Sequence, residues 1–172
     1  MPVWVFGYGS LIWRPDFPYL ECKPAALEGF VRRFWQGSHD HRGAPEAPGR
    51  VVTLIAEPGG ICRGTAYLVE QTVFAHLDHR EKNGYERFEV ELLLGAVSVS
   101  GAVSVMAIVY IAPTSNHAYL GEASIADIAA QIKSSAGPSG TNLEYLLQLA
   151  EALRNLGADD PHVFELEAMV RG

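Results

Sequence analysis

Near its start the chain contains the stretch Val5-Phe6-Gly7-Tyr8-Gly9-Ser10-Leu11. An apolar run that stops at a glycine is typical of a short strand buried on both faces, so we expect a strand over residues 3–6. The glycines after it favour a tight turn, in which successive backbone N–H groups can converge on an anion or a polarised carbonyl. The alternative is a purely structural turn in which Tyr8 and Ser10 pack locally.

Further along the chain, a helical pattern ends in a carboxylate. Apolar residues recur at helical spacing at Val73, Phe74 and Leu77, and Glu81 continues the same stripe. We therefore predict a helix over residues 70–81, ended by Asn83-Gly84. The carboxylate of Glu81 is either solvated at a frayed helix end, paired with a neighbouring cation, or held in a pocket. In a pocket, burial would raise its pKa and make it a better base near neutral pH.

The composition indicates an ordered globular protein, since 48% of the 172 residues are hydrophobic and 19% are charged. This length fits one domain, 1–172, with a substantial core. The net charge of −7 and the absence of a Lys/Arg run argue against a nucleic-acid partner. Cys22 and Cys62 do not suggest a disulfide framework. With no signal-peptide pattern and no apolar run of membrane-spanning length, we expect a cytoplasmic protein that needs neither a membrane nor an obligate protein partner.

Strand patterns dominate the first two-thirds of the chain. β-branched and aromatic residues between Gly/Pro positions, or strict alternation, favour further strands. We predict them over 25–35, 50–56, 63–70, 87–94 and 103–112, with 98–101 as a hairpin connection.

After Pro113 the patterns are helical. One amphipathic helix carries Ile125, Ile128, Ala129 and Ile132, and a second opens with the capping box Thr141-Asn142-Leu143-Glu144 and ends at Gly157. Asp160 before Pro161 predicts a third helix start. Strands first and helices last predict an α+β protein, and the number of uneven strands favours a curled or barrel-like sheet.

The turn over residues 7–11 matches none of the common cofactor or nucleophile motifs. Ile12 stands where a dinucleotide fingerprint or a Gly-x-Ser-x-Gly elbow requires glycine, which also argues against Ser10 as a nucleophile. No Gly-Lys-Ser/Thr follows, so a P-loop is excluded. We expect no cofactor.

Histidines near residue 40 raise the question of a metal. His39 and His41 could share a strand face, with His76 or His79 as a third ligand. Their spacing matches no zinc motif, so we expect no metal.

Three other kinds of residue have both a functional and a structural interpretation. Arg42, in a polar loop with Asp40, could bind a substrate carboxylate through two hydrogen bonds or form a surface salt bridge. Tyr145 lies off the leucine stripe of its helix, where it either packs or points its phenol into a cleft. Both cysteines are interpreted as ordinary thiols.

Five blocks of sequence, in this order along the chain, resemble the ChaC-type, glutathione-specific γ-glutamylcyclotransferases. They are Val5-Phe6-Gly7-Tyr8-Gly9-Ser10-Leu11-Ile12-Trp13; Trp35-Gln36-Gly37-Ser38 followed by Asp40-His41-Arg42-Gly43; Pro48-Gly49-Arg50-Val51-Val52-Thr53-Leu54; Arg80-Glu81-Lys82 with Gly84-Tyr85; and Gly140-Thr141-Asn142-Leu143-Glu144-Tyr145-Leu146. His79 and Ala136 are small departures, at positions to which no role is assigned.

The resemblance implies a small mixed β-barrel with peripheral helices, concentrated in the C-terminal third. It also implies cleavage of reduced glutathione to 5-oxoproline and cysteinylglycine, without metal, nucleotide or covalent intermediate. By analogy Glu81 is the general base, and the loop of Tyr8, Gly9, Ser10 and Leu11 holds the γ-glutamyl group. Further candidates for substrate binding are Arg42, Tyr85 and Tyr145.

Two rival functions remain open at the level of sequence. One is a cyclotransferase for other γ-glutamyl amines or amino acids, which would share the fold and the base. The other is a non-catalytic module that binds γ-glutamyl compounds. Glu81 argues against the second, because binding alone needs no base at that position.

Overall fold

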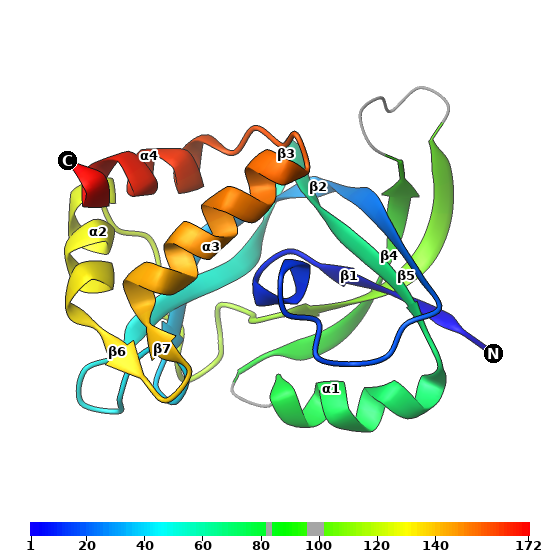
Figure 1. The fold of residues 1–172 in the computed structure, drawn as a ribbon, viewed down its shortest axis with the longest axis horizontal. Coiled ribbons are helices and arrows are strands. Elements are labelled where there is room, and N and C mark those ends of the chain that lie inside the picture. The colour runs from blue at the N-terminus through cyan, green and yellow to red at the C-terminus, as the bar shows by residue number, and fades with distance from the viewer. Residues whose placement is uncertain (82–83, 96–101) are drawn as a thin grey trace.

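The computed structural model describes residues 1–81, 84–95 and 102–172, and at its centre lies a closed barrel (Figure 1). Its strands are β1 (Val3–Gly7), β2 (Glu21–Ser38), β3 (Gly49–Val69), β4 (Glu86–Leu94) and β5 (Val103–Ile111). They follow the order β1-β3-β2-β4-β5. Parallel pairing of β1 with β5 closes the barrel, and the other neighbours are antiparallel. The predicted α+β class with a barrel-like sheet is confirmed. The predicted hairpin connection at 98–101 lies outside the described residues.

The long strands β2 and β3 form a ribbon that runs from the barrel toward the C-terminal helices (Figure 1). The sequence patterns predict separate strands at 50–56 and 63–70, which is wrong, because both belong to β3. Residues 57–60, rich in Pro and Gly, lie opposite a shift of register at Gly29 and form an irregularity within the ladder. Gly29 and Gly59 have φ values of +87° and +79°, which glycine adopts without steric cost.

The helical segment predicted over 70–81 begins with a 3₁₀ turn, η2 (Gln71–Val73), and continues as α1 (Phe74–Arg80). Its apolar side packs on the outside of the barrel, where Phe74 and Leu77 join a cluster with Val5 and Tyr110. The N–H of Glu81 donates to the carbonyl of Leu77 at 2.9 Å and so ends the helix. Because the apolar stripe of this helix is buried against the barrel, the position of Glu81 at the end of the helix is fixed.

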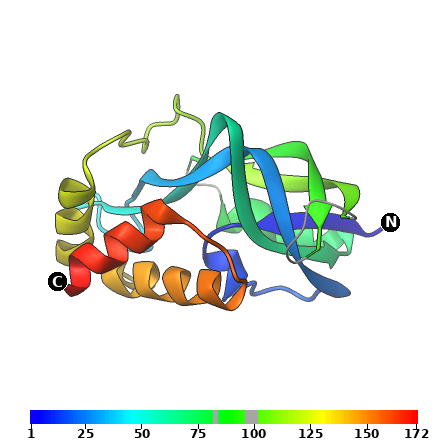
Figure 2. The same ribbon diagram turned by 90° about the horizontal axis from the view of Figure 1, so that it is seen from above.

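Three helices, α2 (Ile125–Ser134), α3 (Asn142–Asn155) and α4 (Pro161–Arg171), gather at the end of the molecule away from the N-terminus (Figure 2). A small hairpin of β6 (Ala136–Gly137) and β7 (Gly140–Thr141) joins α2 to α3. The predicted caps are confirmed at Thr141, whose Oγ1 accepts from the N–H of Glu144 at 3.1 Å, and at Asp160, whose Oδ1 accepts from that of Val163 at 3.2 Å.

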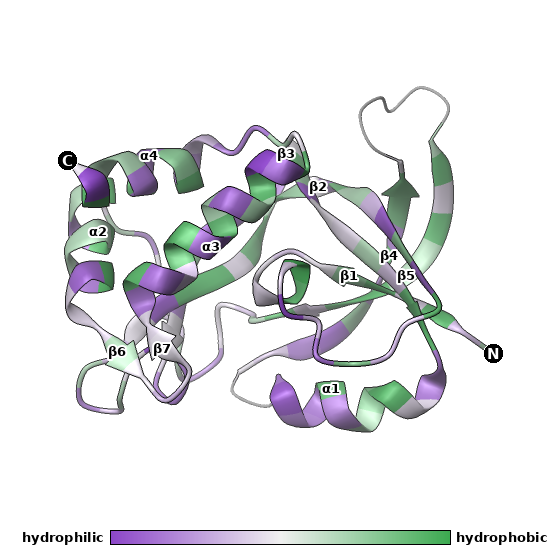
Figure 3. Ribbon diagram, in the orientation of Figure 1, coloured by the Kyte–Doolittle hydropathy of each residue, from purple (hydrophilic) through white to green (hydrophobic). Residues whose placement is uncertain are grey.

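One hydrophobic core joins the barrel to this helical layer. It contains Phe34 and Leu54 from the β2–β3 ribbon together with Ile128, Leu146 and Leu166 from α2, α3 and α4. Figure 3 shows α3 with alternating apolar and polar residues, as expected for a helix with one buried face. Among the described residues, no helix is long and apolar enough to cross a membrane. The helical layer thus packs against the ribbon, and Asn142 at the start of α3 is hydrogen-bonded to Arg50 near the start of β3.

Candidate active site

Two adjoining cavities lie among β1, α1, the β2–β3 ribbon and α3. The large cavity has a volume of about 310 Å³ and the small cavity about 50 Å³. Both are lined by Ser10, Glu81, Tyr85 and Tyr145, which therefore form a shared wall. The small cavity is otherwise bounded by residues of the barrel strands and of the turn after β1, namely Phe6, Val52 and Tyr110, and Tyr8, Gly9 and Leu11. Charged and polar groups predominate around the large cavity, among them Arg14, Asp16, Asp40, His41, Arg42, His76 and Arg80.

Glu81 lies in this shared wall with only 18% of its side chain exposed. Burial raises the pKa of its carboxyl from 4.5 to about 6, and the charge of Arg80 partly opposes that rise. Nε of Arg80 is 3.9 Å from Oε1 of Glu81. At neutral pH the carboxylate is ionised, yet it binds a proton more readily than an ordinary glutamate. Two of the three alternatives for Glu81 therefore hold together, since its carboxylate lies in the pocket wall and is paired with Arg80.

Arg80 connects the end of α1 to the glycine turn. Its Nη2 donates to Oγ of Ser10 at 3.0 Å, and its Nη1 donates to the carbonyl of Pro15 at 3.0 Å. Oγ of Ser10 accepts a hydrogen bond from a cation, so the hydroxyl keeps its own proton for donation. This arrangement does not activate Ser10 as a nucleophile.

Hydrogen bonds from distant residues fix the turn that follows β1. The hydroxyl of Tyr8 donates to the carbonyl of Tyr110 at 2.5 Å, and the carbonyl of Tyr8 accepts from Nε of Arg32 at 2.7 Å. The carbonyl of Leu11 accepts from the hydroxyl of Tyr67 at 2.7 Å. These contacts hold the backbone of the turn at both ends without using its N–H groups.

The short helix η1 (Ser10–Ile12) starts at Gly9 without a side-chain cap. Within the described part of the chain, the N–H groups of Gly9, Ser10 and Leu11 make no hydrogen bond. A Cβ atom added to Gly9 would lie 3.0 Å from Oη of Tyr145 and 3.0 Å from a methyl carbon of Val52. Glycine therefore allows a close approach of the turn to α3 and leaves donors beside the small cavity.

Tyr8, Tyr85 and Tyr145 line the small cavity together with Glu81. Tyr85 donates to the carbonyl of Val52 at 2.8 Å, and Tyr145 accepts from the N–H of Val52 at 3.3 Å. Burial, with a further contribution from Glu81, raises the pKa of Tyr145 to about 12 and those of Tyr8 and Tyr85 well above 10. All three phenols stay protonated at neutral pH. Tyr8 and Tyr85 donate their protons to backbone carbonyls, whereas Tyr145 accepts from a backbone N–H and keeps its proton for donation.

Both interpretations of Tyr145 hold in the structure. Its ring packs edge-on against Trp13 and Phe34, with centroids 5.4 and 5.8 Å away, while its hydroxyl lies at the shared wall. Arg42 is likewise buried, with 4% of the residue exposed, and its guanidinium lies 5.7 Å from the ring of Tyr145. Its Nη1 donates to the carbonyl of Thr141 at 3.1 Å and contacts Glu144 at 3.5 Å. Arg42 therefore forms an ion pair and also lines the large cavity.

Two structural residues of the site were not predicted from sequence. Arg32 lies in the core and pairs with Asp160 at 2.6 Å while it holds the carbonyl of Tyr8. Asn142 is fully buried, and its side chain accepts from the N–H of Arg50 at 2.7 Å and donates to its carbonyl at 2.8 Å. The Gly-Thr-Asn block was a signal for Asn142, whereas nothing local marks Arg32.

The histidines and cysteines do not form a recognisable centre. His41 and His76 line the large cavity, and Nδ1 of His41 is 3.2 Å from Oγ of Ser139. In the ranges 1–81, 84–95 and 102–172, no group of three or more His, Cys, Asp or Glu residues is placed to hold a metal ion. Burial raises the pKa of the Cys62 thiol to about 11, so this cysteine is a poor nucleophile at neutral pH.

The barrel, the glycine turn and the buried carboxylate define a γ-glutamylcyclotransferase fold. The chain is similar to the crystal structure of a γ-glutamylcyclotransferase specific to glutathione from yeast, with a TM-score of 0.92 and 33% identity over 99% of this chain and 96% of that one. The ChaC-like protein model matches residues 3–172, and the chain belongs to this family.

Two relatives share 42% identity with the chain. One is γ-glutamylcyclotransferase 2-3 of Arabidopsis thaliana, over 99% of this chain and 89% of the relative. The other is glutathione-specific γ-glutamylcyclotransferase 1 of Danio rerio, over 96% of this chain and 87% of the relative.

Proposed function

We propose that this protein is a glutathione-specific γ-glutamylcyclotransferase. In the reaction, the α-amine of the γ-glutamyl group attacks its own γ-carbonyl. A carbon–nitrogen bond closes the ring of 5-oxoproline, and the bond to the cysteinyl nitrogen breaks to release cysteinylglycine. The observation that carries the proposal is Glu81, a buried carboxylate with a raised pKa beside the Tyr8–Leu11 turn, in a chain of the ChaC-like family.

The proposed role of Glu81 is to move one proton. The substrate amine is protonated at neutral pH and cannot attack until a base removes its proton. The rise in the pKa of Glu81 from 4.5 to about 6 makes that transfer easier by about 2 kcal/mol. When the tetrahedral intermediate collapses, the same carboxyl returns that proton to the departing nitrogen. The attacking nitrogen loses a second proton as it becomes the lactam N–H, and this proton ends on the released amine, which leaves as an ammonium group.

The Tyr8–Leu11 turn is proposed to hold the γ-glutamyl half. The attack is intramolecular, so the enzyme must fold the substrate into a near-attack geometry rather than bring two molecules together. Negative charge develops on the γ-oxygen, and N–H groups at Gly9, Ser10 and Leu11 are suited to stabilise it. Donors that are held in place before the reaction need no reorganisation during it.

Tyr85, Tyr145 and Arg42 are proposed as further binding groups. The hydroxyl of Tyr145 accepts from the N–H of Val52 and can donate its own proton to a substrate oxygen, whereas that of Tyr85 donates to the carbonyl of Val52 and can accept from a substrate N–H. The guanidinium of Arg42 carries a charge in the cavity wall and can pair with a substrate carboxylate. The proposed chemistry uses proton transfer and hydrogen bonding, and we expect turnover in the presence of a chelator.

The test is incubation of the purified protein with reduced glutathione, with detection of 5-oxoproline and cysteinylglycine by mass spectrometry. Equimolar products are expected, and Glu81→Gln should lower kcat by about 10²- to 10⁴-fold. Because the pKa of Glu81 is higher in the folded state, the fold loses stability as pH rises from 4.5 to 6, and the loss is complete above pH 6. Glu81→Gln should therefore unfold no more easily than wild type above pH 6, and the free energy of unfolding should rise by up to about 2 kcal/mol.

The matched control is Glu86→Gln, which changes an exposed glutamate of β4 outside both cavities. Near-normal turnover by a folded Glu81→Gln protein would rule out the assigned role. Product from γ-glutamyl-alanine but not from glutathione would show that the substrate is a γ-glutamyl compound other than glutathione. Thermal stabilisation by glutathione with no product from either compound would favour a binding module.

We also propose that residues 1–172 act as one domain in the cytoplasm. The shared core of barrel and helices supports the first point. The free thiols of Cys22 and Cys62 support the second, since a reducing compartment keeps both thiols and glutathione reduced.

A further inference from the structure

The large cavity is the part of the site that can distinguish glutathione from other γ-glutamyl compounds. This inference rests on the proposed function, in which the Tyr8–Leu11 turn holds the γ-glutamyl group beside the small cavity. All γ-glutamyl substrates share that group, so preference must come from contacts with the group attached to it. Glu81 belongs to both cavities, which places the bond to be broken at the shared wall and the cysteinylglycine half in the large cavity.

Cysteinylglycine ends in a carboxylate, which calls for a cation in the large cavity. The described lining of this cavity includes three arginines, Arg14, Arg42 and Arg80. Arg80 donates to Ser10 and Pro15 and lies beside Glu81, whereas Arg42 donates to the carbonyl of Thr141 and contacts Glu144.

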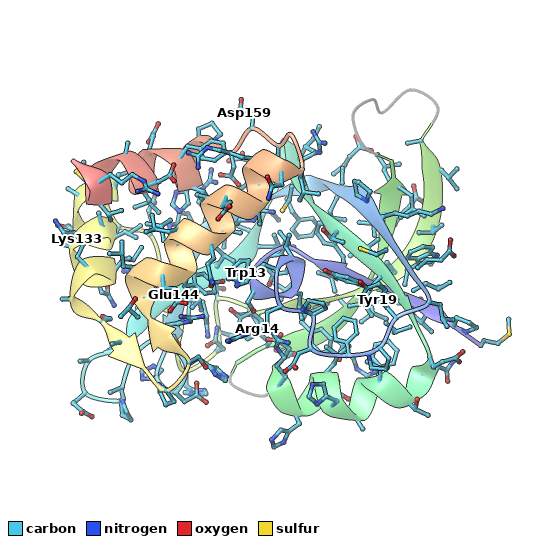
Figure 4. The ribbon with its side chains drawn as sticks, in the orientation of Figure 1. Trp13, Arg14, Tyr19, Lys133, Glu144 and Asp159 are labelled. Carbon is cyan, nitrogen blue, oxygen red and sulfur yellow. The ribbon has the colours of Figure 1, made fainter. Side chains whose placement is uncertain are left out.

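Arg14 differs from the other two arginines. In the described part of the chain, its guanidinium has no hydrogen bond, ion pair or ring contact, and the residue is exposed. It lies close enough to Arg42 for the two like charges to interact, which helps to lower the pKa of Arg42 after the larger effect of burial. Figure 4 shows Arg14 between α1 and the start of α3, where Glu144 lies.

The backbone of Arg14 is nevertheless held firmly. Its N–H donates to the carbonyl of Ser10 at 2.7 Å, and the ring of the preceding Trp13 packs edge-on against Tyr145. The same short segment therefore carries the turn at Ser10 and, four residues later, a cation that has no partner among the described residues. A long side chain on an anchored backbone can reach a carboxylate in the cavity at a modest entropic cost.

We propose that Arg14 binds the terminal carboxylate of the cysteinylglycine half and thereby favours glutathione over γ-glutamyl compounds without that carboxylate. Arg14 does not touch the reacting atoms, so it is a specificity residue. The turn that binds the γ-glutamyl group and the arginine that binds the terminal carboxylate belong to one short segment. A substrate bound at the Tyr8–Leu11 turn therefore extends toward Arg14.

The experiment crosses two enzymes with two substrates. Wild type and Arg14→Ala are assayed with glutathione and with its glycinamide analogue, in which the terminal carboxylate is an uncharged amide. Wild type should prefer glutathione by about 10- to 100-fold in kcat/KM, the range for a hydrogen bond to a charged group. In Arg14→Ala this preference should fall to about one, while kcat/KM for the amide stays within about twofold of wild type. Arg14→Lys should restore part of the preference, since it keeps the charge but not the planar fork.

The control is Arg171→Ala, which removes an exposed arginine of α4 that lies outside both cavities. An equal loss on both substrates would overturn the inference and assign Arg14 a structural role. An unchanged preference in Arg14→Ala would also overturn the inference. If Arg42→Gln loses the preference instead, the contact with the terminal carboxylate belongs to Arg42. If wild type forms no 5-oxoproline from either substrate, the proposed function itself fails, and that result is distinct from the other three.

Discussion

Replacing Arg80 by glutamine should move the acid limb of the pH–rate profile to higher pH. The guanidinium of Arg80 lies 3.9 Å from the carboxylate of Glu81 and opposes the effect of burial on its pKa. Glutamine removes the positive charge but keeps an amide that can donate to Ser10. The pKa of Glu81 should therefore rise above about 6. A base with a higher pKa is already protonated, and so inactive, at a higher pH.

The size of the shift follows from the separation and the burial of the two groups. Unit charges about 4 Å apart interact by about 1 kcal/mol in water and about 4 kcal/mol at an effective dielectric constant of about 20. Both side chains keep some contact with solvent, at 16% and 18% exposure, so the lower part of this range applies. About 1.4 kcal/mol corresponds to one pKa unit, which moves the limb from about 6 to about 7.

The assay is kcat/KM for 5-oxoproline release between pH 5 and 9. At pH 6 wild type should work at about half of its plateau and Arg80→Gln at about a tenth of its own, whereas near pH 8 both should approach their plateaus. Arg87→Gln is the control, because Arg87 pairs with Asp78 outside both cavities. A limb that stays in place or moves to lower pH in Arg80→Gln, with plateau activity retained, would refute Glu81 as the titrating base.

Three further changes test the supporting structure. Gly9→Ala places a Cβ 3.0 Å from Oη of Tyr145, and it should lower turnover at least tenfold with a loss of about 1–3 kcal/mol in stability, measured by urea unfolding. Asn142→Ala leaves the buried N–H and carbonyl of Arg50 unpaired and should cost about 2–4 kcal/mol in the same assay. Burial lowers the pKa of His162 from 6.5 to about 4, so the fold should lose up to about 3 kcal/mol as pH falls through that window, and His162→Gln should remove this loss.

Each of these has a comparison on the same chain. Asn155→Ala changes an exposed asparagine at the end of α3 and should be close to neutral, so equal losses at Asn155 and Asn142 would contradict the proposed bridging role. His117→Gln, at an exposed loop position, should leave the acid dependence of stability unchanged. A Gly9→Ala variant with full activity would show that the close approach to Tyr145 is not required.

Local patterns were sufficient for most of the fold. Alternation and helical spacing report which faces are buried, and cap residues satisfy backbone groups close by in sequence, so Thr141 and Asp160 were predictable as helix starts. The break assigned to residues 57–60 was wrong, because the partner strand β2 supplies a matching irregularity at Gly29. A strand's continuity depends on its neighbour as well as on its own composition.

At the site, pattern and motif were enough to identify the candidates, namely the glycine turn and the carboxylate at the end of a buried stripe. They could not show that Glu81 and the turn share a wall, that Arg80 lies beside both, or that Arg32 holds the carbonyl of Tyr8, which the packing of the folded chain brings about. The physical reason is that a pKa, an ion pair or a cavity depends on groups brought together across the fold, whereas periodicity and capping act over a few neighbouring residues.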